Sequence, residues 1–416
     1  MIMAMKESGI EWVGLIPDTW SVIPNKYVMH KEKNLCEKWS GEDVMSLTMN
    51  GVIVRDLQNP TGKMPATFDG YQYIEDGDLL MCLFDIDITP RCVGRVTHDG
   101  VTSPAYSNFK VHDNASRDYF YYYYLMVDNT KELLHLAKNL RHSFTEEQLG
   151  QLKVPMPLLS EQQTIADYLD EECSKIDDII AEANASIEEY KELKQAVIDN
   201  ATMTGIHDSE MKYTDYTWFP EMPQNWDLVL ASLLFREDVR PVDADDVSLS
   251  LSQVDGLIPT DDMSERSLKS ATHDNWKHVI PDDLVLNRFK GHLGVFFASK
   301  YTGMVSFHYG VYHAIRDDVY AKYYEYLFHS TTYKNIFALK SNGITVGLQN
   351  LSNGNFYSVK ILHPTLDEQI EIVKYLDKRT AEINSLIAEK EFLIKDLESY
   401  KKSLIYEVVT GKRRVV

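Results

Sequence analysis

The sequence predicts an α+β protein made of two related mixed α/β domains and two long helices with a heptad pattern. Three observations support this fold class. The chain of 416 residues repeats itself after about half its length. Each half begins with short runs rich in β-branched and aromatic residues, punctuated by glycine and proline, which are typical of strands and turns. Each half ends with roughly 40 residues in which apolar positions recur in alternating steps of four and three, which indicates a coiled-coil helix.

The internal repeat is carried by two pairs of matching segments. WVGLIPDTW, which begins at Trp12, returns as WFPEMPQNW from Trp218, shifted by 206 residues. SEQQTIADYLDEECSKIDDIIAE, from Ser160, returns as DEQIEIVKYLDKRTAEINSLIAE from Asp367, shifted by 207 residues. Solenoid repeats are only about 20 to 50 residues long. We therefore expect two fused copies of one unit, with two similar surfaces related by pseudo-two-fold symmetry.

Strand-like and helix-like runs follow the same order in both halves. The first has VIVRDL, DLLMCLFDIDI and FKVHD before the helical stretch DYFYYYYLMVDNTKELLHLAKNL. The second has DLVLNRFKG, GVFFASK and VYHAI before AKYYEYLFHSTTYKNIFAL. Asp78 and Asp283 occupy matching places in these runs. We expect the following parts in chain order: a first domain at 1–157, a first long helix at 158–212, a second domain at 213–364 and a second long helix at 365–416.

The two long helices should share a seam of the same length and phase. Ser160 and Asp367 are the expected N-caps, and Gly205 and Gly411 are the expected stop signals. Two helices that lie independently on their own domains are the alternative, which the shared phase disfavours. The predicted seam consists of Leu169, Ile176, Ile180, Ile187, Tyr190 and Val197 in the first helix, and Leu376, Ile383, Ile387, Ile394, Leu397 and Leu404 in the second.

Composition limits the class of protein. The net charge is −21, and residues 156–212 carry −10 of it. Nucleic-acid binders usually show a basic footprint, so the acidic balance favours a subunit whose partners supply positive charge. The four cysteines form no CxxC pair, which argues for a reducing compartment and against a disulfide framework or a structural zinc site. With no signal peptide and no apolar run of about 20 residues, a soluble cytoplasmic protein without membrane contact is expected.

Several catalytic signatures are missing from the sequence. No GxxxxGK[ST] loop is present, so the chain has no ATP-driven motor of its own. The nearest match to the NPPY motif of DNA amino-methyltransferases is SPAY at Ser103, which lacks the second proline and a preceding glycine-rich turn. Pro281-Asp282 has no partner at the spacing of a PD-(D/E)xK nuclease. The pairs His273/His278 and His308/His313 are each five residues apart, which suits no metal-binding face, so structural histidines are expected.

This arrangement resembles the specificity subunit of type I restriction–modification enzymes. The resemblance is carried by SGIEWVGLIPDTW near the start, VPMPLLSEQQTIADYLDEECSKID in the middle, and HPTLDEQIEIVKYLDKRTAEINSLI with VVTGKRRV at the end. The segment that begins at Trp12 and the segment that begins at Ser160 are each weak motifs alone, but each occurs twice, in the same order, over essentially the whole chain. The resemblance implies two target-recognition domains that each read one half of a split DNA sequence. It also implies that the two long helices form an antiparallel coiled coil that separates these domains.

The resemblance also implies what the chain works with. Two modification (methyltransferase) subunits would dock on the helices, carry the S-adenosylmethionine site and methylate adenine in double-stranded DNA. Restriction/translocase subunits would use ATP and Mg for translocation and cleavage. The chain itself would hold no cofactor, metal or catalytic residue, which agrees with the missing signatures. Because the two domains differ in sequence, the expected DNA target is asymmetric and bipartite.

Base recognition needs Arg or Lys for guanine and Asn or Gln for adenine, presented from loops or helix ends. These residue types and places define the candidates. In the first domain they are Arg91, Arg95, Asn108, Lys110 and Arg141, and in the second they are Arg288, Lys290, His292 and His308. The tyrosine run from Tyr119 to Tyr124 could stack on bases, but its place at the start of an amphipathic helix favours core packing. An ordinary solvated side chain is the alternative for each candidate.

Three other functions remain open. The chain could be a decoy subunit, or a specificity component of a related system, that binds modification subunits. It could be a coiled-coil scaffold without a DNA role, in which case co-expression with a modification subunit would yield no methylated motif. A self-sufficient methyltransferase or nuclease would turn over DNA alone, and the missing motifs argue against it.

Overall fold

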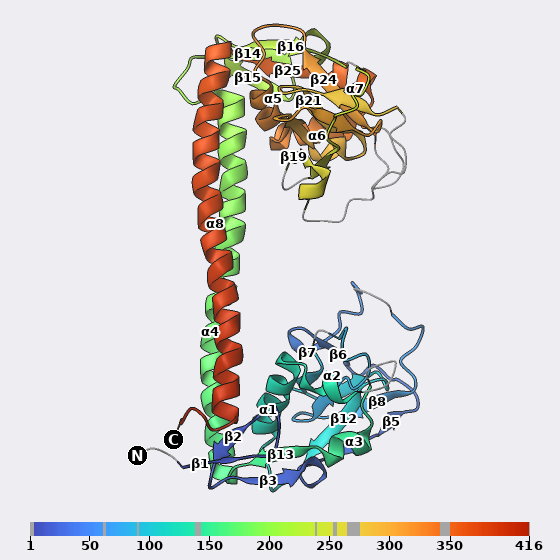
Figure 1. The fold of residues 1–416 in the computed structure, drawn as a ribbon. Helices are drawn as coiled ribbons and strands as arrows, with labels where there is room; N and C mark the ends of the chain where they lie inside the picture. The colour runs from blue at the N-terminus through green and yellow to red at the C-terminus, as the bar shows by residue number, and fades with distance from the viewer. Residues whose placement is uncertain are drawn as a thin grey trace. The chain divides into compact units, whose positions relative to one another are not determined.

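The computed structural model describes residues 4–60, 64–89, 91–137, 143–237, 239–252, 256–263, 275–341 and 350–415. The chain forms two compact units. Unit 1 comprises Met1–Ala183 and Phe392–Val416, and unit 2 comprises Asn184–Glu391. Each unit therefore contains one mixed α/β domain, the first part of one long helix and the last part of the other. Figure 1 labels these elements along the chain.

The domain of unit 1 is built mainly from short strands. The first nine elements are β1 (Met5–Glu7), β2 (Leu15–Pro17), β3 (Ser21–Pro24), η1 (Asn25–Tyr27), β4 (Met29–Glu32), β5 (Leu35–Cys36), β6 (Val44–Thr48), β7 (Gly51–Val54) and β8 (Tyr71–Ile74). They are followed by β9 (Leu79–Met81), β10 (Val93–Arg95), β11 (Gly100–Thr102), β12 (Ser107–Val111), α1 (Arg117–Asn129), α2 (Glu132–Leu136), α3 (Glu146–Gln151) and β13 (Lys153–Met156). The first long helix, α4 (Leu159–Thr204), begins three residues after β13.

The strands of unit 1 form two larger sheets and two strand pairs. One sheet has the order β10-β9-β12-β4, and the other has the order β5-β8-β11-β6-β7. In the second sheet β11 pairs with β6 in parallel and with β8 antiparallel. The separate pairs are β1-β2 and β13-β3. The β13-β3 pair joins the two ends of the domain sequence, because Val154 lies opposite Ile23.

Unit 2 repeats this series of elements. Its strands and 3-10 helices up to β20 are β14 (Met211–Tyr216), β15 (Phe219–Pro223), β16 (Asp227–Leu230), η2 (Ala231–Leu233), β17 (Phe235–Glu237), β18 (Leu249–Ser252), β19 (Gly256–Pro259), η3 (Thr260–Asp262) and β20 (Lys277–Val279). They are followed by β21 (Leu284–Asn287), η4 (Arg288–Leu293), β22 (Phe296–Ala298), β23 (Gly303–Val305), β24 (Tyr309–Ala314), α5 (Ala321–Phe328), α6 (Thr331–Lys340), α7 (Asn353–Tyr357), β25 (Lys360–His363) and α8 (Leu366–Val409).

The two domains share their strand order, which confirms the predicted repeat. The sheet β22-β21-β24-β17 of unit 2 has the order of β10-β9-β12-β4 in unit 1, and the pairs β14-β15 and β16-β25 match β1-β2 and β3-β13. The five-stranded sheet has its counterpart in the pairs β18-β19 and β20-β23, which a parallel bridge from Ser248 to Met304 links. The mixed α/β fold class of both domains is therefore as predicted.

The ends of the long helices are partly as predicted. Gly205 and Gly411 follow the last helical turns with φ of 80° and 72°, the left-handed conformation that favours glycine at a helix end. The predicted N-caps are wrong by two residues. Helix α8 begins at Leu366, and Thr365 Oγ1 accepts a hydrogen bond from the Glu368 N–H, so Thr365 is the cap and Asp367 lies in the first turn. Helix α4 begins at Leu159, which likewise places Ser160 inside the helix.

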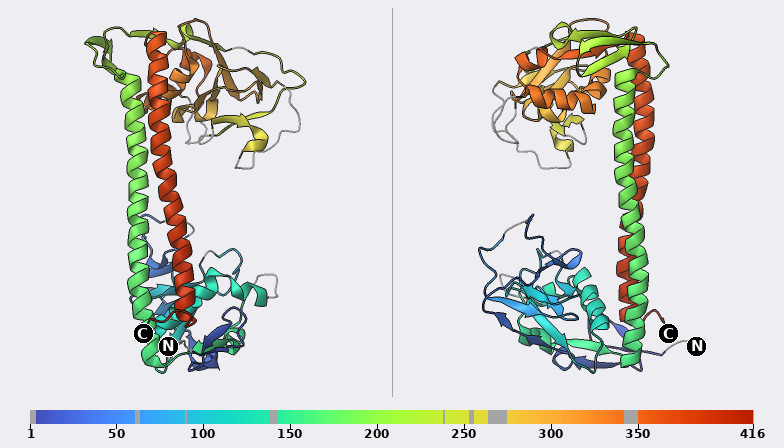
Figure 2. Two further views of the ribbon diagram at one scale, coloured as in Figure 1. Left: turned by 60° about the vertical axis from the view of Figure 1, so that its left-hand side comes forward. Right: turned by 180° about the vertical axis from the view of Figure 1, so that it is seen from behind.

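Within each unit the two long helices lie side by side and antiparallel, as Figures 1 and 2 show. In unit 1 the Lys401 ammonium group lies 2.6 Å from the Asp177 carboxylate. In unit 2 the Lys194 ammonium group donates to Asn384 Oδ1 over 2.8 Å. All twelve predicted seam residues are buried or half-buried, and most residues between them are exposed. The Lys401–Asp177 and Lys194–Asn384 contacts occupy equivalent positions of the repeat, because the residues that match are 207 positions apart.

The end of each long helix packs into the core of the unit that contains it. In unit 1 the apolar core includes Trp20, Tyr119 and Leu404, and in unit 2 it includes Trp226 and Ile198. The tyrosine run of α1 belongs to this core: Tyr119, Phe120, Tyr122, Tyr123 and Tyr124 are all buried. Core packing is therefore confirmed over base stacking for the buried members of the run.

The single helix expected after the last strand of each sheet is in fact two helices. In unit 1 the chain leaves α1 at Thr130, and Lys131 adopts a left-handed conformation with φ of 54° before α2 begins. In unit 2, Ser330 ends the connection after α5 and caps α6 by accepting a hydrogen bond from the Tyr333 N–H. The apolar periodicity continues across both breaks, which is why the sequence pattern did not show them. No helix in the described parts of the chain has the length and apolar character needed to cross a membrane.

Candidate nucleic-acid interface

A buried glutamine attaches each domain to the long helix that follows it. Gln162 is 0% exposed; its Oε1 accepts a hydrogen bond from the Ser116 N–H over 2.7 Å, and its Nε2 donates to the Pro157 carbonyl over 2.9 Å. Gln369 does the same in unit 2, with the Tyr320 N–H and the Pro364 carbonyl as partners, each at 2.9 Å. Because both partners are backbone groups at the N-terminal ends of helices, the glutamine fixes the start of α4 against α1 and the start of α8 against α5.

A tyrosine and an aspartate form a second equivalent contact in each unit. The Tyr122 hydroxyl donates to Asp170 Oδ1 over 2.7 Å, and the Tyr326 hydroxyl donates to Asp377 Oδ1 over 2.6 Å. Unit 1 adds a cation to this contact. The Arg95 guanidinium lies 2.7 Å from Asp118 and 3.1 Å from Asp170. Burial lowers the pKa of Arg95, but its hydrogen bonds to the two carboxylates outweigh this effect and raise the pKa overall.

The predicted DNA-binding residue Arg95 therefore lies at the junction between its domain and α4, where its guanidinium binds the carboxylates of Asp118 and Asp170. Arg91 is close by, because the guanidinium groups of both arginines lie over the Tyr121 ring, at 6.0 and 5.1 Å from its centroid. Arg91 NH1 donates to the Met49 carbonyl over 2.8 Å, which holds the tip of the β6-β7 hairpin. Together with the helix pair, these side chains line a cleft of about 600 Å³ within unit 1.

The other first-domain candidates lie elsewhere. Asn108 is only 1% exposed, and its Nδ2 donates to Asp78 Oδ2 over 2.7 Å, so its amide is not presented to solvent. Lys110 is more exposed, but its ammonium group lies 2.8 Å from Glu75 and also contacts Glu32. Arg141 lies outside the described residues. The structure thus brings together Arg91 and Arg95 and separates them from Asn108 and Lys110, which lie on β12.

In unit 2 Arg288 belongs to a half-buried ion network. Its guanidinium lies 2.6 Å from the Glu237 carboxylate, which also binds the Lys277 ammonium group at 2.7 Å. Burial raises the pKa of Glu237, but hydrogen bonds from Lys277 and Asn353 and the charge of Arg288 lower it overall. Because both cations bind the same carboxylate, Arg288 holds η4 against β17 in this structure.

Lys290 and His308 are exposed in unit 2, and two exposed aromatic residues lie beside them in the structure. The His308 ring lies 3.8 Å from the Phe307 ring and 5.4 Å from the Phe289 ring, measured between centroids. Phe289 and Phe307 are 41% and 51% exposed, so this cluster combines stacking surfaces with a nearby lysine. The side chain of His292 is outside the described structure.

Sequence reasoning missed the exposed apolar residues beside the candidates. The β6-β7 hairpin exposes Met49, Ile53 and Val54, and η4 and the β23-β24 turn expose Phe289 and Phe307. A signal was present, because the loop segments RFKGHLG and SFHYG place aromatic residues next to the basic ones that were selected. Hydrogen-bonding side chains are not the only ones that can contact bases, because exposed aromatic side chains can do so as well.

One group of side chains in the described residues has the spacing of a metal site. Ligand atoms of Asp243, Asp246 and His278 lie within 4.8 Å of one another. The ring Nδ1 of His278 lies 2.7 Å from the Asp246 carboxylate, so an ion pair or hydrogen bond accounts for the contact without a metal. His278 is thus placed as a structural histidine here.

Comparison with known proteins identifies the family. Residues 92–189 and 260–395 match the family described as "Type I restriction modification DNA specificity domain". The fold is similar to a chain from a structure entitled "Structural basis underlying complex assembly and conformational transition of the type I R-M system", with a TM-score of 0.68 and 12% identity over 96% of this chain and 99% of that one.

A second similar fold is the HsdS subunit from Thermoanaerobacter tengcongensis, with a TM-score of 0.51 and 12% identity over 96% of this chain and 98% of that one. At this identity, both likenesses concern the fold alone. The family matches lie in both halves of the chain and together cover more than half of it. The chain therefore belongs to the type I restriction modification DNA specificity family, and it is a non-catalytic DNA sequence-specificity subunit that works with DNA and other subunits of its complex.

Proposed function

We propose that each unit reads one half of an asymmetric bipartite sequence in double-stranded DNA and that the helix pair docks two modification subunits. The observation that supports this most strongly is the shared strand order of the two domains, combined with different side chains on corresponding loops. One backbone plan would place both domains on DNA in the same way. Different loop residues would then select different bases.

In unit 2 we propose that the cluster around His308 contacts the DNA. Lys290 would bind a phosphate or a base edge, while the exposed rings of Phe289 and Phe307 would stack or form apolar contacts. In unit 1 we propose that the exposed β6-β7 hairpin contacts the DNA, although its counterpart by strand order in unit 2 is the β18-β19 pair and not η4. Arg91 would then act as a positioning residue, since its guanidinium binds the Met49 carbonyl at the tip of this hairpin.

A variant of one unit tests this assignment. Lys290→Gln and His308→Ala, made separately, should change or relax the sequence of one half-site and leave the other half-site unchanged. The control is Lys374→Gln, an exposed lysine on α8 that lies outside the proposed contact cluster. The readout is methylome sequencing of a host that expresses the variant with the modification subunit. Loss of specificity in both half-sites at once would contradict the assignment.

The surface of the helix pair supports docking of two copies of one partner. Exposed apolar residues recur at equivalent positions of the repeat: Ile179 and Leu386 are 46% and 40% exposed, and Leu193 and Tyr400 are 45% and 46% exposed. Both pairs are separated by 207 residues. A partner present in two copies needs the same surface twice. Unit 1 supplies Ile179 and Tyr400, and unit 2 supplies Leu386 and Leu193.

Charged substitutions test the docking surface. The double variant Ile179→Asp with Tyr400→Asp should retain one modification subunit in place of two, and Leu386→Asp with Leu193→Asp should do the same. Leu339→Asp is the matched control, because Leu339 is 75% exposed on α6, away from the long helices. The stoichiometry of the purified complex, measured by native mass spectrometry, decides the question. Two bound subunits in both double variants would exclude this surface.

We propose that the cofactors lie in the partners. Modification subunits would bind S-adenosylmethionine and methylate adenine, and restriction/translocase subunits would use ATP and Mg in the cytoplasm, where the DNA substrate lies. Support comes from the sequence, which lacks the phosphate-binding loop and methyltransferase motif that such activities need. No observation favours a decoy or a scaffold. Methyl transfer by the isolated chain would contradict this division of labour.

A further inference from the structure

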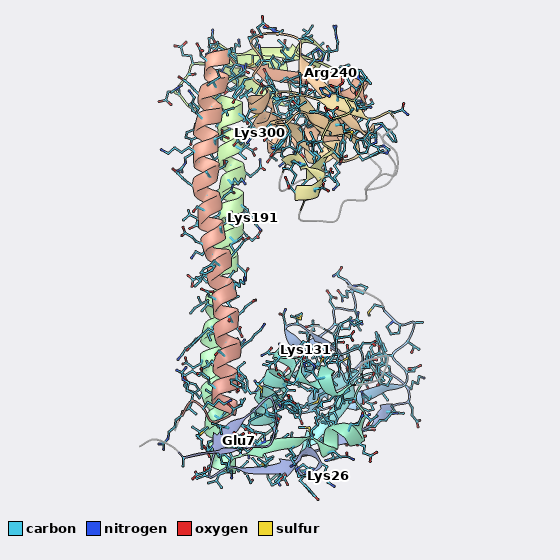
Figure 3. The ribbon with its side chains drawn as sticks, viewed as in Figure 1. Glu7, Lys26, Lys131, Lys191, Arg240 and Lys300 are labelled. Atoms are coloured by element: carbon cyan, nitrogen blue, oxygen red, sulfur yellow. The ribbon has the colours of Figure 1, made fainter. Side chains whose placement is uncertain are left out.

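Unit 2 contains an open, mainly polar cleft between its domain and its part of the helix pair. The cleft has a volume of about 400 Å³. Its walls come from β19, β22 and α5 on the domain side and from α4 and α8 on the helix side. Three lysines line it: Lys194, Lys300 and Lys322. Figure 3 labels Lys300 on the side of the domain that faces α4.

Two of these lysines have different partners, a neutral amide for Lys194 and a carboxylate for Lys322. The Lys194 ammonium group is half-buried and donates to the neutral Asn384 Oδ1 over 2.8 Å, and burial lowers its pKa. Lys322 lies over the Tyr326 ring at 5.1 Å and forms an ion pair with Glu325. Among the described residues that line the cleft, Glu325 is the one carboxylate.

A half-buried histidine at the cleft lies near several of these positive charges. His329 lines the cleft and is held neutral, because burial and then the charges of Lys334, Lys322 and Lys194 lower its pKa to about 3. Lys334 itself is bound to the neutral Gln195 Oε1 over 3.0 Å. Asp199 and Asp377 are not among the residues that line the cleft, and their carboxylates accept hydrogen bonds from the Thr331 N–H and the Tyr326 hydroxyl.

The equivalent cleft of unit 1 is neutralised differently. Lys401 occupies the position of Lys194, and Asp177 occupies that of Asn384, each 207 residues away. Lys401 therefore contacts both oxygens of a carboxylate at 2.6 Å, where Lys194 has only an amide. Arg95 in the same cleft is bound by two further carboxylates. One substitution in the repeat thus gives Lys401 a carboxylate partner and leaves Lys194 with no carboxylate partner among the residues that the structure describes.

We propose that the cleft of unit 2, built around Lys194, Lys300 and Lys322, is a phosphate-binding site. Compact ammonium groups on mobile stems suit a phosphate group, and a dianion would supply the negative charge that Asn384 does not. The phosphate would be either a free small anion or a phosphate of the DNA backbone. This site shares no residue with the proposed His308 cluster.

Isothermal titration of the full chain with inorganic phosphate, against chloride at matched ionic strength, tests the proposal. We expect saturable binding that Asn384→Asp weakens about tenfold or more, because it gives Lys194 the carboxylate present in unit 1. The Asn384→Asp variant differs little in size, and its circular dichroism spectrum should match that of the native chain. The control is Lys191→Gln, which removes an exposed lysine on α4, the helix that also carries Lys194, and this variant should bind phosphate normally.

A second arm identifies the source of the phosphate. If the site holds a DNA phosphate, a saturating duplex should displace inorganic phosphate, and Asn384→Asp should reduce the salt dependence of DNA binding by about one phosphate. If it holds a free anion, phosphate binding should persist in the DNA complex. Failure to bind phosphate above the chloride control, or equal binding by Asn384→Asp and the native chain, would overturn the proposal. Neither outcome depends on the methylated sequence, so the proposed half-site assignment is tested separately.

Discussion

Replacing Gln162 by alanine should destabilise unit 1 and leave unit 2 intact. The native side chain is 0% exposed and satisfies two backbone groups, the Ser116 N–H at 2.7 Å and the Pro157 carbonyl at 2.9 Å. Alanine would leave a buried donor and a buried acceptor without partners. Each such group costs about 1–3 kcal/mol, so we expect a loss of about 3 kcal/mol or more in the stability of unit 1.

Native-state hydrogen exchange of the backbone amides of α1 and α5 measures this effect in the two units separately. In Gln162→Ala the α1 amides should exchange about 100-fold faster, which corresponds to about 3 kcal/mol, and the α5 amides should be unaffected. Gln369→Ala should produce the reverse pattern. Gln163→Ala is the control, because Gln163 is exposed and its amide donates to Asp167 on the same helix. Equal acceleration in α1 and α5, or a change below about 0.5 kcal/mol, would refute the reasoning.

Three further predictions concern pH, backbone conformation and helix length. His329 has a folded-state pKa of about 3, below its ordinary value of 6.5, so the unfolded chain binds the extra proton between these values. The free energy of unfolding of unit 2 should therefore fall as pH drops below about 6.5, by about 2 kcal/mol at pH 5. In His329→Gln, urea unfolding should show a smaller fall over the same pH range. The same pH dependence in this variant and the native chain would contradict the role of His329. Gly411→Ala should destabilise unit 1 more than Gly205→Ala destabilises unit 2, because a Cβ at 411 would lie 2.5 Å from Pro17 Cδ whereas the nearest atom at 205 is 3.2 Å away; equal melting shifts would be evidence against it. Inserting four residues into both α4 and α8, about 6 Å of helix, should lengthen the unread spacer of the DNA target by one or two base pairs, and an unchanged spacer in the methylome would refute a role of the helices in spacing.

The duplicated architecture could be predicted from the sequence because its signals are local and occur twice. Heptad steps on either side of Ile180 and Ile387 are visible without any contact information. The terminal glycines were equally readable, since Gly205 and Gly411 both adopt the left-handed conformation that a helix end favours. Gln162 lies in one of the repeated segments, but its role could not be read from the sequence, because the Ser116 N–H that it binds is 46 residues away along the chain.

The candidate DNA contacts were harder to predict, because a sequence does not show which charges are already paired. Arg95 and Arg288 have the residue type and loop position of base-reading residues, yet the structure places both beside carboxylates. The partner of Arg95, Asp170, is 75 residues distant, and that of Arg288, Glu237, is 51 residues distant. Helix ends depend on similar detail, which is why the N-cap of α8 is Thr365 and not the predicted Asp367.

Long-read methylome sequencing of a host that expresses this chain with its modification subunit tests the central claim most directly. We expect methylated adenines in one asymmetric motif, made of two different short half-sites separated by base pairs of any sequence. A single uninterrupted motif, two identical half-sites, or no methylated motif in the presence of a functional modification subunit would contradict it.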